Sequence, residues 1–191
     1  VEGNKQFTDK KIRRQMKNTK EYRWWRVWKS SRLVESDFKA DKDLIIEKYN
    51  NEGYRDARIT FDTSYLTTTT KHKFFPFWKK KTKENVVINM NVYEGKKFYF
   101  RNITWIGNTK YTSEELSHRL RINKGDAYNK DLLQKNVNYD PTGKDISSLY
   151  LDDGYLFFHA IPTEINVDND SIDIEMRIYE GNQARIGRVA I

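Results

Sequence analysis

Apolar and polar residues alternate strictly near the end of the chain, which is typical of a strand with one buried face. The apolar positions there are Ile172, Ile174, Met176 and Ile178. The same spacing occurs earlier, at Val86, Ile88, Met90 and Val92. Shorter apolar runs predict strands at 57–63, 99–105 and 156–165. The turn residues at 168–170 join the strand at 156–165 to the one that contains Ile172 and Ile178, as a hairpin.

Helical signals lie between these strands. Thr112 and Glu115 have the spacing of a capping box, and Leu116 and Leu120 follow on one helical face. The equivalent cap at Thr8 has Lys11 in place of the glutamate, so we expect it to be weaker. A second helix carries Leu44, Ile45 and Tyr49 on one side and stops at Gly53. Pro141 and Gly143 divide the later helical region into segments at 129–137 and 145–151.

The chain is an internal repeat. Gly3-Asn4 recurs as Gly107-Asn108, Gly53-Tyr54 as Gly154-Tyr155, and Glu94-Gly95 as Glu180-Gly181, always in the same order. The first copy carries 15 more residues than the second between its last two landmarks, and this insertion lies at about 66–85. Residues 185–191 resemble 99–105, so a third copy is expected to begin there.

Each copy therefore reads strand, helix, helix, strand, strand. We expect an α+β fold in which two helices cover one face of a three-stranded mixed sheet. The predicted domains are residues 1–97, with a truncated first strand, and residues 98–183. Residues 184–191 are predicted to start the first strand of a further domain.

Charge separates the two copies. The 191 residues carry a net charge of +8, with 24 basic and 13 acidic residues in 1–98 and 11 and 14 in 99–191. Most of the excess lies in 10–32 and 71–84, and both runs contain aromatic rings. The 27 Phe, Tyr and Trp residues argue for a folded chain in spite of its high charge.

Nothing in the sequence points to catalysis. The chain has no cysteine, and its three histidines, His72, His118 and His159, lack the spacing of metal ligands. Phosphate-binding loops, nucleophile elbows and zinc-protease motifs are missing. We therefore predict no catalytic residue, no cofactor site and no metal site.

The order strand, Gly-Asn, helix, helix, Gly-Tyr, strand, strand, Glu-Gly resembles the POTRA (polypeptide-transport-associated) domain, twice over nearly the whole chain. The landmarks are similar to those of the BamA family of outer-membrane protein assembly factors in Gram-negative bacteria, and residues 124–129 fit that family's interhelical stretch. Residues 155–158 and 170–173 resemble its Bacteroidetes branch.

This resemblance implies a non-catalytic module on the periplasmic face of the outer membrane. Its implied partners are unfolded outer-membrane proteins, accessory lipoproteins, neighbouring POTRA domains and the protein's own C-terminal membrane barrel. In this family the strand after Gly-Tyr is expected at a sheet edge, here 55–62 and 156–165, where an extended client can add a strand. The candidate edge residues are Ala57, Ile59, Phe61, Leu156, Phe158, Ala160 and Ile161. The alternative for the second set is packing against helices or a neighbouring domain.

A second candidate surface interleaves basic and aromatic residues. Its members are Trp24, Trp25, Arg26, Trp28, Lys29, Phe75, Phe77, Trp78, Lys79, Lys80 and Lys81. These rings could cover an enlarged core while the basic stems reach water. They could also dock a POTRA neighbour, a lipoprotein or anionic lipid headgroups, or bind nucleic acid, which the repeat disfavours.

Two alternatives to an assembly-factor module stay open at this point. One is a POTRA module of a related translocation or secretion transporter. The other is a basic module that binds membrane surfaces or nucleic acid. Phosphate contacts would make such binding fall steeply with salt, whereas strand addition would not.

Overall fold

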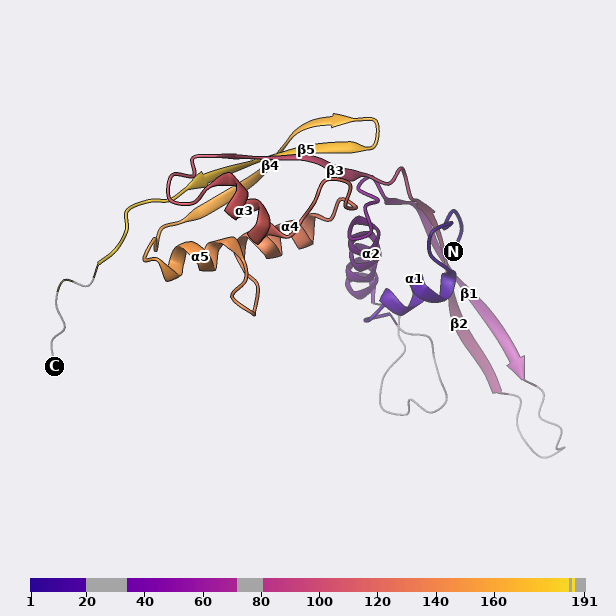
Figure 1. The fold of residues 1–191 in the computed structure, drawn as a ribbon. Helices are drawn as coiled ribbons and strands as arrows, with labels where there is room; N and C mark the ends of the chain where they lie inside the picture. The colour runs from indigo at the N-terminus through magenta and orange to yellow at the C-terminus, as the bar shows by residue number, and fades with distance from the viewer. Residues whose placement is uncertain (20–33, 72–80, 186, 188–191) are drawn as a thin grey trace. The chain divides into compact units, whose positions relative to one another are not determined.

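The computed structural model describes residues 1–19, 34–71, 81–185 and 187 (Figure 1). The chain divides into two compact units, one formed by 1–49 and 56–95 and the other by 50–55 and 96–191. In the described part of the chain, no helix combines the length and apolar composition that crossing a lipid bilayer requires.

The second unit is a three-stranded mixed sheet with its helices on one face (Figure 1). Its strands are β3 (Tyr99–Ile106), β4 (His159–Asp168) and β5 (Ser171–Tyr179), in the order β3-β5-β4. β5 is parallel to β3 and antiparallel to β4. Its apolar alternation places Ile172, Ile174, Met176 and Ile178 in the core, as the sequence predicts.

The helices of this unit begin within a residue of the predicted starts. α3 (Ser113–Leu120) has a complete capping box, because Glu115 N donates to Thr112 Oγ1 and Thr112 N donates to Glu115. α4 (Lys130–Asn138) and α5 (Ile146–Asp152) are separate, capped by Asn129 and Asp145. The helical region is thus divided at Pro141 and Gly143, which confirms the prediction.

The first unit repeats this plan with less sheet. α1 (Asp9–Gln15) and α2 (Glu35–Asn50) accompany an antiparallel pair, β1 (Arg58–Lys71) and β2 (Lys81–Tyr93). Glu2 forms a parallel bridge to β2, as β3 pairs with β5 in the second unit, since Glu2 N donates to Met90 O and Val92 N donates to Glu2 O. The Thr8 cap of α1 is indeed weaker, with a single long bond of 3.4 Å from Lys11 N.

The insertion at 66–85 differs from the expectation. The sequence pattern predicts two short strands on either side of it, but both strands continue into it and pair in register from Leu66↔Val86 to Lys71↔Lys81. The β-branched threonines 67–70 favour this extended backbone. The result is a two-stranded ribbon that continues the hairpin of the first unit.

Candidate functional site

The first strand of the long hairpin has one open edge. β1 pairs with β2 on one side, and no described strand pairs with its other side. An open edge presents unpaired backbone N–H and C=O groups, to which another extended segment can bind. The sequence-predicted residues lie here: Ala57 is buried just before β1, Ile59 is half-buried, and Phe61 is exposed.

A bulge determines which way these side chains face. Pairing shifts between Ile59 and Phe61, so Ile59 lies opposite Val92 while Phe61 lies opposite Asn91. Cross-strand partners share a face, Val92 is buried, and Ile59 lines a groove together with residues of α2. Ile59 therefore faces α2, whereas Phe61 lies on the other side of the sheet with 61% of its surface exposed.

A groove of about 710 Å³ runs between α2 and β1. Its apolar lining comes from Phe38, Ile46, Ala57 and Ile59, and charged residues surround these side chains. Lys42 crosses from the helix to the strand, with its Nζ 3.2 Å from Asp62 Oδ2 and 4.9 Å from the centre of the Phe38 ring. The groove thus joins an open strand edge to an apolar floor.

The helix side of this groove was missed by sequence reasoning. Phe38, Lys42 and Ile46 are spaced by four residues, which places them in one row along α2. That spacing was the available signal for a row of residues that lines a groove. The same spacing is equally typical of a row that faces the core. A buried Asp41 beside this row, which accepts the backbone N–H groups of Asn18 and Thr19, was also missed.

The corresponding edge in the second unit is β4, which pairs only with β5 among the described strands. The strand begins three residues later than predicted, so Leu156 and Phe158 precede it. The predicted residues divide into two groups by burial. Ala160 is buried, and Phe158 stacks on Tyr150 with ring centres 4.1 Å apart. Leu156 and Ile161 are exposed by 58% and 48%. Ala160 and Phe158 therefore pack in the core, and Leu156 and Ile161 face solvent.

The shared Glu-Gly landmark closes each unit onto its own beginning. Glu94 Oε1 accepts the backbone N–H groups of Lys5 and Gln6 and the hydroxyl of Tyr49. In the same way, Glu180 accepts hydrogen bonds from the backbone N–H groups of Thr109 and Lys110 and from the hydroxyl of Tyr150. Burial alone would raise the pKa of Glu180, but these donors outweigh it and hold the pKa below its usual value. The landmark is therefore structural.

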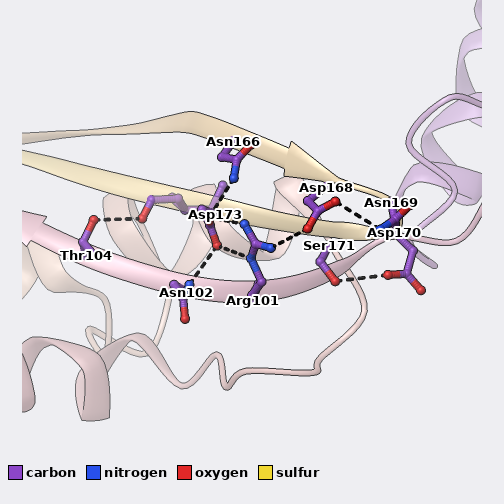
Figure 2. A network of polar contacts seen from close by, with 10 residues as sticks. Arg101, Asn102, Thr104, Asn166, Asp168, Asn169, Asp170, Ser171 and Asp173 are labelled. Atoms are coloured by element: carbon purple, nitrogen blue, oxygen red, sulfur yellow. Dashed lines mark hydrogen bonds and ion pairs between the residues drawn. The ribbon is translucent and has the colours of Figure 1, made fainter.

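A polar network covers part of the second sheet on the face away from the helices (Figure 2). Arg101 donates from Nε and Nη2 to both oxygens of Asp173, at 2.8 and 2.6 Å, and Asn102 adds a bond of 3.0 Å. The hydrogen bonds from Arg101 hold the pKa of Asp173 at about 2. Both outer strands bulge opposite this part of β5, so the network fixes the register of two irregular ladders.

The other candidate surface lies mostly outside the described residues. Trp24, Trp25, Arg26, Trp28, Lys29, Phe75, Phe77, Trp78, Lys79 and Lys80 fall in 20–33 and 72–80. Lys81 is the first residue of β2. In the described ranges, no group of three or more His, Asp or Glu side chains is arranged to hold a metal ion.

Two curated relatives match the chain over most or all of its length. It is 24% identical over 192 residues to a Neisseria meningitidis protein named outer membrane protein assembly factor BamA, covering 100% of this chain and 22% of that protein. It is 24% identical over 153 residues to a putative outer membrane protein assembly factor of Treponema pallidum, covering 80% and 16%. The chain thus spans about a fifth of the length of these relatives.

A solved structure and a family model agree on the fold. The crystal structure of POTRA domains 3–5 of Haemophilus influenzae BamA superposes with a TM-score of 0.54 at 20% identity, over 95% of this chain and 64% of that one. The POTRA model, described as a surface antigen variable number repeat, matches residues 1–95 and again 98–181. The chain therefore belongs to the POTRA family, of which it carries two consecutive repeats.

Proposed function

We propose that this chain is a non-catalytic POTRA module of an outer-membrane β-barrel assembly factor, on the periplasmic face of the outer membrane. In this proposal 1–97 and 98–183 are consecutive domains, and 184–191 begins a further one. The similarity to two assembly factors along the chain supports it. Its partners would be unfolded outer-membrane proteins, accessory lipoproteins, the membrane barrel and neighbouring POTRA domains.

The groove between α2 and β1 carries the mechanistic part of the proposal. A strand of an outer-membrane barrel alternates apolar and polar residues, so one of its faces is apolar. Added to the open edge of β1, such a strand can place that face against Phe38, Ile46 and Ile59 and its polar face toward water. Backbone hydrogen bonds supply most of the attraction, and they depend little on the side chains of the client. The groove thus suits clients that share a pattern rather than a motif.

Binding of this kind should be weak. A few backbone hydrogen bonds at about 0.5–1.5 kcal/mol net each offset little more than the entropy of association. We expect a Kd on the order of 0.1–1 mM for a barrel-strand peptide of about ten residues. Rapid exchange at this affinity would let a client pass on to the barrel.

Replacing Ile59 with Glu should weaken peptide binding at least tenfold, because a carboxylate would then face the apolar side of the incoming strand. The measurement is an amide-resolved NMR titration of the chain at about 50 and 200 mM salt. Wild-type shifts along β1 and α2 should change little with salt, since no phosphate is bound.

Thr63→Glu is the matched control. It adds the same charge to the same strand, but Thr63 pairs with Asn89 on the opposite face, so the affinity should stay within about threefold. Equal losses in both variants, or shifts that vanish at the higher salt, would rule out strand addition in this groove. Shifts confined to 156–165 would move the client site to β4.

We also propose that the ribbon formed by the outer halves of β1 and β2 docks a protein partner of the assembly complex. Leu66 and Val86 form an apolar pair on one face, exposed by 70% and 42%, and Tyr65 and Val87 form another on the opposite face. A lipid surface would cover one face of a flat ribbon, whereas a protein cleft can cover both. Two-stranded ribbons are marginal alone, so a partner would also stabilise this one.

Deleting residues 67–84 should abolish co-purification of the full assembly factor with its accessory partners while leaving the core of the first unit folded. The double variant Leu66→Ser and Val86→Ser, which keeps the ribbon length, should weaken that association at least tenfold. Unchanged complex assembly in both variants would refute docking at the ribbon. Loss of vesicle binding with an intact complex would instead point to lipid.

A further inference from the structure

The turn after α2 belongs to the second unit, although α2 itself lies in the first. Three contacts within the second unit hold this turn, residues 50–55. Phe98 N donates to Gly53 O at 2.8 Å, Asn129 Nδ2 donates to Asn51 O at 2.9 Å, and Arg55 Nη2 lies 2.7 Å from Glu164 Oε2. The turn is thus part of the following unit's structure.

The first of these contacts recurs in the second copy. Gly154 is the equivalent of Gly53, and Ala184 is the equivalent of Phe98. Ala184 N donates to Gly154 O, again at 2.8 Å. The geometry leaves no room for a side chain in either turn, since a Cβ on Gly53 would lie 3.0 Å from Phe98 O and one on Gly154 2.9 Å from Ala184 O. Residues 151–156 are therefore arranged as 50–55 are.

The chemistry of the two turns is different. Leu156 stands in the place of Arg55, and Phe157 in the place of Asp56. Leu151, Leu156 and Phe157 are exposed by 44%, 58% and 74%. A Cβ on Gly181 would lie 3.1 Å from Phe157 Cβ, just as one on Gly95 would lie 3.2 Å from Asp56 Cβ, so the backbone approach is the same in both copies. An ionic contact at the first turn is thus replaced by an apolar surface at the second.

We infer that residues 151–157 are the docking surface for a following unit of the same fold, which carries an apolar side chain at the position equivalent to Glu164. The inference rests on the proposal that another POTRA domain begins at 184. The occupant follows from the repeat, because the equivalent turn is already part of the unit that comes after it. The side chain at the position equivalent to Glu164 must be apolar because Leu156 carries no charge. A carboxylate placed against Leu156 would be buried without a partner.

The junction can be tested with the chain's own second unit. A copy of residues 98–183 is appended after Gln183, so that Phe98 of the copy takes the place of Ala184. The chain has no cysteine, so Leu151→Cys provides a single thiol whose modification rate reports burial of the turn. Four chains combine Leu156 or Leu156→Arg with Glu164 or Glu164→Leu in the appended copy.

Matched pairs should protect the thiol. Leu156 with Glu164→Leu, and Leu156→Arg with Glu164, should each slow modification at least tenfold relative to the unextended chain. The two mismatched pairs should slow it less than threefold. The Arg–Glu chain rebuilds the natural junction of the first turn and shows that the appended unit folds and docks.

Protection in the Arg–Glu chain alone would overturn the apolar junction, and equal rates in all five chains would overturn docking at 151–157 altogether. Peptide titration of the α2–β1 groove in the same chains separates this result from the proposed function. If the thiol is protected but the peptide does not bind, the docking surface at 151–157 is supported and client binding by strand addition at the groove is refuted.

Discussion

Replacing Gly107 with Ala should lower the free energy of unfolding of the second unit by at least about 3 kcal/mol. Gly107 has φ +87°, a conformation that costs a side-chain-bearing residue about 1–2 kcal/mol. A Cβ there would also lie only 2.3 Å from Ile178 O, a backbone atom of the central strand that cannot move aside cheaply. Amide hydrogen exchange of β3 and β5 during urea titration measures the loss.

Gly125→Ala separates the two causes. Gly125 has nearly the same φ, +90°, but a Cβ there meets no atom within 4 Å. Its cost should be that of the backbone conformation alone, about 1–2 kcal/mol. If both variants lose the same stability, the close approach to Ile178 contributes nothing and the Gly-Asn landmark is only a turn signal.

Replacing Glu180 with Ala should cost the second unit about 3 kcal/mol at neutral pH. The carboxylate accepts hydrogen bonds from two backbone N–H groups near the start of the unit and from the Tyr150 hydroxyl. A hydrogen bond to a charged group contributes about 1.5–3 kcal/mol net, and solvent exposure of the two backbone bonds keeps the total near the lower end of their sum. Its loss also leaves the hydroxyl of the fully buried Tyr150 without this acceptor. Urea unfolding followed by amide exchange gives the value.

The pH dependence distinguishes this mechanism from a packing defect. The folded-state pKa of Glu180 is lowered, so its contribution is present above the unfolded pKa of about 4.3 and is lost as pH falls through the folded value. The stability gap between wild type and Glu180→Ala should therefore narrow below about pH 4. Tyr150→Phe, which removes one donor and keeps the ring, should cost about 1 kcal/mol. A gap that is constant with pH would contradict the charged-acceptor account.

Much of the fold follows from local patterns. The alternation around Ile174 predicts a half-buried strand, and β5 is that strand, while Thr112, Asn129 and Asp145 mark helix starts to within a residue. These signals work because each depends on residues close in sequence. The repeat adds the topology, since two copies with the same landmarks restrict the possible arrangements.

The groove could not be predicted in the same way. It depends on the separation of α2 and β1 and on the bulge that directs Ile59 and Phe61 to opposite faces. A bulge at Thr60 has no residue signature, because neither a glycine nor a proline marks it. The ion pair of Lys42 and Asp62 likewise joins positions whose contact only the tertiary structure creates.

The central strand of each sheet is the last one in sequence, since β5 lies between β3 and β4 and β2 lies between Glu2 and β1. During synthesis, β3 and β4 therefore have no partner until residues 171–179 exist. Contacts such as Arg101 to Asp173, 72 residues apart, close a long loop and are expected late in folding. A nascent or truncated unit lacking its final segment would expose two unpaired strands, so proteolysis and aggregation compete with folding until the last residues arrive.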